Sequence, residues 1–469
     1  MTAEFDLVIR GGRIATASDV FHADIGILEG RIAALGQALG PGREEIDARG
    51  RLVLPGGVDA HVHLDQPTSD GSVMADDFDS GTRSAAFGGT TTVIPFACQQ
   101  KGHGLRAAIE DYHARAEGKP LIDYAFHLIV TDPNPQVVGQ ELPALIREGY
   151  TSFKIYTTYD DLKLADREII EVLALSRREG ALTMIHAENS DAIAWLTEAL
   201  ERAGQTAPRH HADARPAIAE REATHRAISL AEIVDVPVLV VHVSGAEAMD
   251  QIAAARAKGL RIFAETCPQY ILLTAADLDL EGFEGAKHIC SPPPRDTASQ
   301  EAIWRGLANG TFQVFSSDHA PYLFDSPTGK KVRGEGASFV HVPNGIPGVE
   351  TRMPLLFSEG VGRGRISLNR FVALTATNPA RLYGLYPRKG TIAIGSDADL
   401  AIWDERREVT IRNALLHHNV DYTPYEGRVV TGWPETVLSR GEVVVYAGTL
   451  HARPGRGRFL ECGTPDTQL

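Results

Sequence analysis

The sequence predicts an α/β fold: a closed (β/α)8 TIM barrel with a small β-sandwich domain built from both chain termini. The middle of the chain alternates short apolar runs with longer amphipathic segments, which is typical of parallel strands joined by helices. The two ends carry short β-like runs without helices between them. Ionisable side chains follow several of the middle runs. This spread favours a barrel over an open doubly wound sheet, whose chemistry gathers at one switch point.

The β-like runs at the two ends predict one composite domain of residues 1–56 and 388–453. The barrel, residues 57–387, is inserted between its halves, and residues 454–469 form an extended C-terminal arm with many Gly, Pro and Arg residues. Turns are expected at Gly11-Gly12 and Glu29-Gly30. The expected strands of this domain are Phe5–Ile9, Ile25–Leu28, Arg31–Leu35, Arg51–Leu54, Leu400–Trp403, Val409–Ile411, Val429–Leu438 and Glu442–Ala447.

The barrel region contains eight apolar runs with the length of strands, separated by segments with helical periodicity. The expected strands are Val58–His63, Thr91–Phe96, Tyr124–Val130, Ser152–Tyr156, Thr183–His186, Val238–Val243, Arg261–Glu265 and Gln313–Ser316. The clearest helices are Leu105–Ala116, Asp166–Arg178, Glu220–Ile233 and Ala246–Lys258. In such a barrel the carboxyl ends of the strands open at one mouth, where catalytic groups lie.

Composition narrows the class of protein. Of 469 residues, 43% are apolar and 23% charged, which is ordinary for a soluble globular protein. The net charge of -15 argues against a nucleic-acid partner, which requires basic patches. No apolar run is long enough for a membrane span, and the first residues do not resemble a signal peptide. The four cysteines form no C-x-x-C pair, so we expect a reducing, cytoplasmic location.

Two histidines one residue apart open the barrel. Alternate side chains of a strand share a face, so His61 and His63 point the same way and form half of a metal site. Four further strands end in groups suited to the other half: Lys154, His186, His242 and Asp318. Each has an ordinary alternative, namely a core histidine, a surface lysine or an N-capping aspartate. Their coincidence at one mouth favours shared chemistry.

Lys154 lies between apolar residues on an inward-facing strand. Burial lowers the pKa of such a lysine, and a neutral amine can take up CO₂ to form a carbamate. A carbamate carries two oxygens and can bridge two cations. Four imidazoles, one carboxylate and this bridge suit two divalent metal ions of the Zn²⁺ type, with Mn²⁺, Fe²⁺, Co²⁺ or Ni²⁺ as alternatives. Two metals activate a bridging water and polarise a carbonyl, and Asp318 is suited to move the proton.

The ordered set of motifs resembles the hydantoinase/dihydropyrimidinase family of the amidohydrolase superfamily. Each motif is weak by itself, but their order and spacing over most of the chain are specific. The matching segments are His61-Val62-His63-Leu64-Asp65, Ala75-Asp76-Asp77-Phe78, Gly88-Gly89-Thr90-Thr91, Ser152-Phe153-Lys154, His186-Ala187-Glu188-Asn189, His242-Val243-Ser244, Cys290-Ser291-Pro292-Pro293, Ser317-Asp318-His319, the run from Pro343 to Glu350 and the run from Asn419 to Gly427.

The resemblance implies a role for each matching residue. The first metal would be held by His61, His63 and Asp318, the second by His186 and His242, and both would be bridged by carboxylated Lys154. Tyr159, five residues after the lysine, would donate a hydrogen bond to the developing oxyanion. Backbone groups at Ser291 and Asn344 would recognise the cyclic amide. The ordinary alternatives for these three are a surface aromatic residue and two turn residues.

The resemblance also implies an activity and an assembly. The enzyme would open a hydantoin or dihydropyrimidine ring, a small cyclic amide or ureide, to an N-carbamoyl amino acid. It would be a homotetramer, or a dimer as the variant, with the C-terminal arm and Val420–Gly427 packed between subunits. The alternatives are an allantoinase or another cyclic amide or imide hydrolase, and a non-catalytic scaffold. Asp65 stands where allantoinases carry a substrate-binding Arg, and the six retained ligands disfavour a scaffold.

The chain departs from the family around the expected pocket for the ring substituent. Tyr156-Thr157-Thr158 stands where relatives more often have Phe-Met-Ala, and Pro95 stands where many have Asp. Gln66, Thr68 and Gln99-Gln100 are more polar than an aryl-hydantoin pocket requires. We therefore predict a substituent that is smaller or more polar than phenyl.

Overall fold

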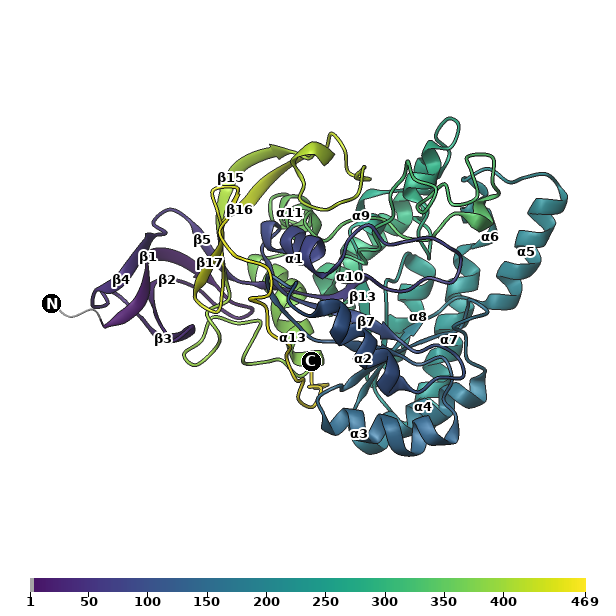
Figure 1. The fold of residues 1–469 in the computed structure, drawn as a ribbon, viewed down its shortest axis with the longest axis horizontal. Helices are drawn as coiled ribbons and strands as arrows, with labels where there is room; N and C mark the ends of the chain where they lie inside the picture. The colour runs from purple at the N-terminus through teal and green to yellow at the C-terminus, as the bar shows by residue number, and fades with distance from the viewer. Residues whose placement is uncertain (1–3) are drawn as a thin grey trace.

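The computed structural model describes residues 4–469 and places a parallel barrel beside a large β-sheet (Figure 1). The barrel strands follow the order β6-β7-β9-β10-β11-β12-β13-β14, and every neighbouring pair is parallel. A parallel bridge between Val62 and His319 joins the two ends of this order, and the N–H of His63 donates to the carbonyl of His319 at 2.7 Å. The predicted (β/α)8 barrel is therefore confirmed.

The barrel strands are short and buried, and helices surround them. The strands are β6 (Gly57–Val62), β7 (Thr90–Cys98), β9 (His127–Ile129), β10 (Ser152–Tyr156), β11 (Leu182–His186), β12 (Val238–Val240), β13 (Ile262–Thr266) and β14 (Val314–Phe315), with β8 (Asp123–Tyr124) beside β7. The longer helices are α1 (Phe78–Phe87), α2 (Leu105–Ala116), α4 (Asp166–Glu179), α5 (Ser190–Arg202), α7 (Ala217–Val234), α8 (Ala246–Ala257) and α10 (Thr297–Asn309). The shorter ones are α3 (Leu142–Arg147), α6 (His210–Ala214), α9 (Gln269–Leu272), α11 (Arg352–Leu356), α12 (Leu368–Val372) and α13 (Asn378–Leu382).

Local sequence explains where these helices begin and end. Helix α2 has the predicted bounds, and α4 extends one residue beyond them. The carboxylate of Glu168 accepts from the N–H of Ala165 at the start of α4, and Gly180 ends the helix in a left-handed conformation. The predicted strand Tyr124–Val130 is divided into β8 and β9, and the predicted strand Val238–Val243 ends at Val240, so His242 lies in the loop that follows.

The second sheet is built from both ends of the chain, as predicted. Among the described residues it has nine strands in the order β18-β17-β16-β15-β5-β1-β2-β3, with β4 also paired to β1. Its N-terminal strands are β1 (Phe5–Ala15), β2 (Val20–Leu28), β3 (Arg31–Gly36), β4 (Gly42–Asp47) and β5 (Leu52–Pro55). Its C-terminal strands are β15 (Leu400–Thr410), β16 (Val429–Ser439), β17 (Glu442–Tyr446) and β18 (Thr449–Leu450).

The prediction of a turn at Gly11-Gly12 is wrong. Strand β1 continues through both glycines with a bulge, and the pairing with β2 shifts register between Ile9 and Gly12. Gly11 has a φ of 63°, and a Cβ on Gly12 would lie 2.5 Å from a methyl carbon of Val53. The glycines therefore bend a strand rather than end it. Strand β4 was not predicted, because its mostly polar residues give no apolar alternation.

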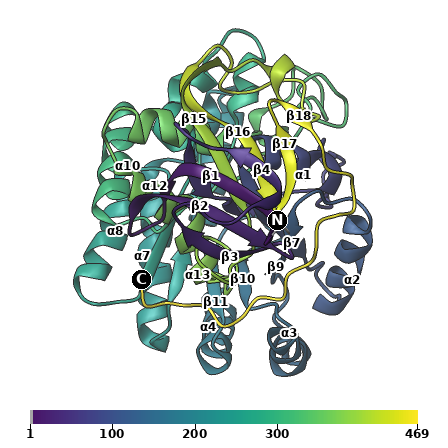
Figure 2. The same ribbon diagram turned by 90° about the vertical axis from the view of Figure 1, so that its left-hand side faces the viewer.

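The two parts of the molecule share contacts and one hydrophobic core. Trp403 of β15 is buried, and its ring centroid lies 5.1 Å from that of Phe357 and 6.0 Å from that of Phe371 on the barrel side. The C-terminal segment then runs along the barrel, below the sheet in Figure 2. There the N–H of Leu460 donates to the carbonyl of Tyr124 at 2.7 Å. Among the described helices, none combines the length and the hydropathy that a bilayer crossing requires.

Candidate active site

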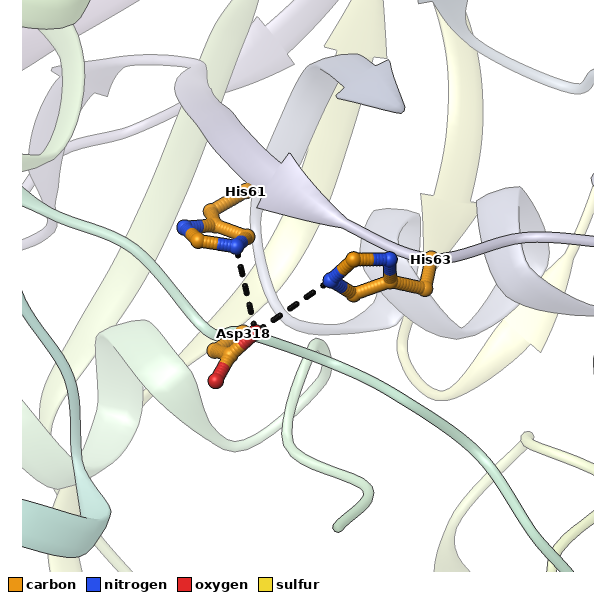
Figure 3. Close-up of side chains that lie close together, drawn as sticks. All are labelled: His61, His63 and Asp318. Atoms are coloured by element: carbon orange, nitrogen blue, oxygen red, sulfur yellow. Dashed lines mark ion pairs between the residues drawn. The ribbon is translucent and has the colours of Figure 1, made fainter. Parts of the chain in front are cut away.

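The barrel brings the predicted metal ligands together at the carboxyl ends of its strands. Nε2 of His61 lies 3.2 Å from Oδ1 of Asp318, and Nε2 of His63 lies 3.4 Å from the same oxygen (Figure 3). Ligand atoms of these three residues all lie within 4.8 Å of one another. Nζ of Lys154, on β10, lies 2.7 Å from Nε2 of His61.

The two remaining histidines complete the same buried cluster. The rings of His186 and His242 are 4.5 Å apart between centroids, and the ring of His242 lies 5.4 Å from that of His61. His186 ends β11, whereas His242 follows β12 with a φ of 38°. Asp318 follows β14 with a φ of 49°. Such left-handed backbone is uncommon outside glycine and often marks functional sites.

Three of the histidines have one ring nitrogen fixed by a polar partner. Nδ1 of His61 lies 2.6 Å from Oε1 of Glu265. Nδ1 of His63 lies 2.7 Å from Oε1 of Gln66. Nε2 of His186 lies 2.8 Å from Oε2 of Glu188. Such partners fix the ring orientation and leave the other nitrogen free for a metal.

Electrostatics keeps two of the ligands, His61 and Asp318, in the protonation states that metal binding requires. Burial lowers the pKa of His61 well below its usual value, so its imidazole is neutral. Burial opposes the charge of Asp318, but the imidazoles of His61 and His63 outweigh this and lower its pKa to about 2. Burial also lowers the pKa of Lys154 to about 8. His61 thus offers a neutral nitrogen and Asp318 a carboxylate, and the neutral amine of Lys154 becomes more accessible than that of an exposed lysine.

This donor set fits divalent metal ions. Imidazole and carboxylate are ligands of Zn²⁺ and of neighbouring transition metals. Nδ1 of His242 is buried and has no hydrogen-bond partner among the described residues. An orphaned nitrogen of this kind in a polar cluster is expected to be satisfied by a group that the protein itself does not supply.

A cavity of about 580 Å³ opens beside the cluster. Its lining includes Lys154, His186, His242 and Asp318, together with the three predicted substrate-binding residues, Tyr159, Ser291 and Asn344. Tyr159 has a φ of 68°, and burial raises its pKa to about 12, so the hydroxyl stays protonated at neutral pH. Oδ1 of Asn344 is buried and finds no hydrogen-bond partner within residues 4–469. The volume and the mixed lining are typical of a site for a small molecule.

Part of the predicted substituent region lies elsewhere. Gln66 and Thr68 line the cavity, but Oε1 of Gln66 is already engaged by His63. Gln99 and Gln100 are not part of the lining, which corrects their expected place there. The side chain of Gln99 instead accepts from the N–H of Thr131 at 3.0 Å and donates to the carbonyl of His103 at 2.9 Å. Through these two hydrogen bonds the buried side chain of Gln99 joins the loop at Thr131 to the loop at His103.

Sequence reasoning missed three buried charged residues around the histidines. Glu265 contacts His61, and its position at the end of a predicted strand was a usable signal. Glu188 contacts His186 and lies in a quoted motif, but no role was assigned to it. Arg215 donates to Oε2 of Glu188 at 2.7 Å and had no sequence signal, because it lies in a loop between α6 and α7.

Asp65 turns out to be engaged outside the cavity. Its carboxylate lies 3.1 Å from Arg115 and 3.6 Å from Lys119. It is not part of the cavity lining. The position two residues beyond His63 therefore supplies no cation to a substrate.

Comparisons with known proteins agree with this geometry. A family model described as Amidohydrolase family matches residues 52–444. A D-hydantoinase of Streptomyces coelicolor is 46% identical over 464 residues, which is 97% of this chain and 98% of that protein. A D-hydantoinase of Geobacillus stearothermophilus is 47% identical over 457 residues, which is 97% of this chain and 96% of that protein.

A solved structure gives the same result. The crystal structure of dihydropyrimidinase from Brevibacillus agri matches with a TM-score of 0.95 and 44% identity. It covers 98% of this chain and 99% of that one. On these matches, the chain belongs to the hydantoinase/dihydropyrimidinase family of the metal-dependent amidohydrolases.

Proposed function

We propose that this chain is a metal-dependent cyclic amidase that opens a hydantoin or dihydropyrimidine ring to an N-carbamoyl amino acid. The observation that carries the proposal is the convergence of six ligand-type side chains, on five strands or in the loops directly after them, beside one small-molecule cavity. The names of the relatives, D-hydantoinase and dihydropyrimidinase, support these rings as substrates.

The metal centre we propose contains two divalent ions. One would be held by His61, His63 and Asp318, and the other by His186 and His242. Lys154, carboxylated by CO₂, would bridge them, and its lowered pKa supports this because only the neutral amine adds CO₂. Zn²⁺ suits this set best, with Mn²⁺, Fe²⁺, Co²⁺ or Ni²⁺ as alternatives. When bound, the ions supply an acidified water and a polarised ring carbonyl.

The residues of the chain would then move the proton and hold the substrate. Asp318 accepts the proton of the attacking water and delivers it to the ring nitrogen as the C–N bond breaks. The Tyr159 hydroxyl, protonated at neutral pH, donates to the carbonyl oxygen as negative charge develops there. Backbone groups at Ser291 and Asn344 hydrogen-bond the cyclic amide and fix the orientation of the ring. We keep the expectation of a substituent smaller or more polar than phenyl.

The alternative activities have less support. An allantoinase is disfavoured because Asp65 is acidic and is paired with Arg115 and Lys119 outside the cavity. A non-catalytic scaffold is disfavoured because the ligand-type side chains remain and converge. A different cyclic amide or imide would use the same machinery, and the choice between rings depends on the cavity alone.

The assembly and location are proposals as well. We propose a homotetramer, with a dimer as the alternative, and a domain division at residues 1–56 with 388–453, 57–387 and 454–469. Trp195, Ile218 and Ile233 expose 66%, 53% and 73% of their surface, which supports burial against another subunit. Light scattering that gives a monomer mass would contradict it. All four cysteines are free, which supports a reducing, cytoplasmic location.

A ring-opening assay on metal-replete enzyme, with and without chelator, tests the activity. The panel contains dihydrouracil, hydantoin, 5-methyl-, 5-phenyl- and 5-carboxyethyl-hydantoin, and allantoin. We expect chelator-sensitive turnover of at least one hydantoin or dihydropyrimidine. Lys154→Ala should lose both metals and turnover. Lys119→Ala, a surface control, should keep its metal content and its turnover. Two bound metals without turnover would indicate that the substrate is another cyclic amide or imide. A protein that binds no metal and turns over none of the rings would favour a scaffold.

A further inference from the structure

We propose that Lys330 is a positioning residue that ties together the two loops carrying Ser291 and Asn344; this inference rests on the proposed function. Nζ of Lys330 donates to the carbonyl of Ile289 at 3.0 Å and to the carbonyl of Pro343 at 2.6 Å. Ile289 stands two residues before Ser291, and Pro343 directly precedes Asn344. One amine therefore bridges the backbone of both substrate-recognition loops.

The amine of Lys330 is buried without a counter-charge. Its side chain is 1% exposed, and within residues 4–469 no carboxylate lies at ion-pair distance from it. Lys389, equally buried, lies within 3.1 Å of three carboxylates, those of Asp123, Asp397 and Asp399. A buried amine is costly unless its protons are bonded. The two loop carbonyls are the only described acceptors for Lys330. The hydrogen bonds that offset the burial of its amine are therefore the ones that join the loops.

The two loops are joined to each other at one further point, and Ile346 joins the second loop to the barrel mouth through the N–H of Ala320. The N–H of Gly345 also donates to the carbonyl of Ile289, at 3.0 Å. Gly345 has a φ of 144°, and a Cβ there would lie 2.4 Å from Cβ of Ala320, two residues after Asp318. Lys330 and Gly345 thus share one acceptor. Lys330 alone among the described donors reaches the carbonyl of Pro343, so it fixes the N-terminal side of Asn344.

The tie has a consequence for substrate binding. Asn344 and Ser291 both line the cavity, and Oδ1 of Asn344 is buried with no partner in the part of the chain that the structure describes. A buried acceptor in a cavity is expected to be satisfied by a ligand. If the tie is cut, the carbonyl of Pro343 loses its donor and the loop shifts. A displacement of about 1 Å in a binding group can cost on the order of 100-fold in rate.

Lys330→Met tests this role, with Lys331→Met as the matched control. Lys331 is the next residue and pairs with Asp325 and Glu335 away from the loops. We expect Lys330→Met to raise KM for hydantoin and 5-phenylhydantoin by the same factor, about 10- to 100-fold, because the loops hold the ring and not its substituent. Bound metal should stay at the wild-type level, and Lys331→Met should leave kcat and KM unchanged.

Hydrogen–deuterium exchange provides a readout that needs no substrate. We expect faster exchange in Lys330→Met over residues 286–292 and 342–347, and wild-type exchange in Lys331→Met. Unchanged exchange over these residues would overturn the proposed link between the loops. Because exchange needs no substrate, this result would count even if the enzyme opened no ring and the proposed function were wrong. Wild-type KM, loss of metal, or a KM change that depends on the substituent would overturn the positioning role.

A conservative variant keeps the test decisive if Lys330→Met does not fold. Lys330→Gln retains N–H donors on a shorter side chain, so it can reach only one of the two carbonyls. We expect a smaller rise in KM and intermediate exchange at 342–347. Wild-type values for both quantities in Lys330→Gln would overturn the proposal.

Discussion

Replacing Glu265 by glutamine removes one buried carboxyl group beside the proposed metal centre and leaves its hydrogen bonds in place. Burial raises the pKa of this carboxyl to about 8, so it carries its negative charge above that pH. Oε1 of Glu265 lies 2.6 Å from Nδ1 of His61 and accepts from the N–H of His242 at 3.1 Å. Oε2 accepts from Oγ of Ser316 at 2.9 Å. The glutamine oxygen can keep the first two contacts, and its NH₂ group can donate to the serine hydroxyl. The variant therefore isolates the charge.

The expected loss follows from the role of that charge. A charge-assisted hydrogen bond is about twice as strong as a neutral one, and it makes His61 a better electron donor to a metal. Partners of metal-bound histidines are typically worth about 10- to 100-fold in metal affinity. At about 1.4 kcal/mol per factor of ten, this is roughly 1.4–2.8 kcal/mol of binding free energy. We expect Glu265→Gln to lose zinc affinity by that factor and to recover turnover at saturating zinc.

A competition titration against a chromophoric chelator measures this affinity at one fixed pH above 8, where Glu265 is ionised. Ser316→Ala is the matched control, because it removes the bond to Oε2 while Glu265 keeps its charge. Its loss of zinc affinity should be smaller than that of Glu265→Gln, because Ser316 contacts Oε2 and not His61, and the charge beside His61 is kept. Equal affinities for Glu265→Gln and wild type, or equal losses in the two variants, would refute the reasoning from charge.

Two further predictions concern catalysis and stability. Tyr159→Phe should lower kcat by about 100- to 1000-fold at unchanged metal content, since only the oxyanion donor is lost; wild-type kcat would contradict its role. Lys389→Met should lower the free energy of unfolding by about 3–5 kcal/mol in urea titrations, because buried Asp399 loses its one cation among the described residues and Asp123 and Asp397 lose one of theirs. Burial opposes the charge of Lys389, but those carboxylates outweigh it and raise its pKa in the folded protein. Its contribution is thus complete below the ordinary lysine pKa and is lost as pH rises through the higher folded value. A difference from wild type that grows with alkaline pH would contradict this sign.

Local rules explain why the barrel and its ligand cluster could be predicted. Strand alternation places His61 and His63 on one face, and strand ends meet at one mouth, so residues far apart in sequence could be assigned to one site. The helices of the barrel were found for a similar reason. Their apolar periodicity is strong, and Leu105–Ala116 has the predicted bounds.

The missed features depend on contacts across the fold. The partner of Glu265 is on β6, which comes near β13 only because the barrel closes past β14, and no local pattern says which histidine it meets. Gln99 looked like a polar pocket residue, but its side chain turns to the loop at Thr131. The glycines at 11 and 12 gave a turn signal, whereas their bulge depends on the side chain of Val53.

Because both chain ends contribute strands to one sheet, the sheet can be completed only after the C-terminal strands have been synthesised. Strand β5 is paired on one side with β1 and on the other with β15, which begins several hundred residues later. At about 5–20 residues per second, the ribosome needs roughly 20–70 s to deliver that partner. Until then the open edge of β5 is a template for the wrong strand. The nascent chain therefore passes through a period of aggregation risk that ends only when the barrel has been made.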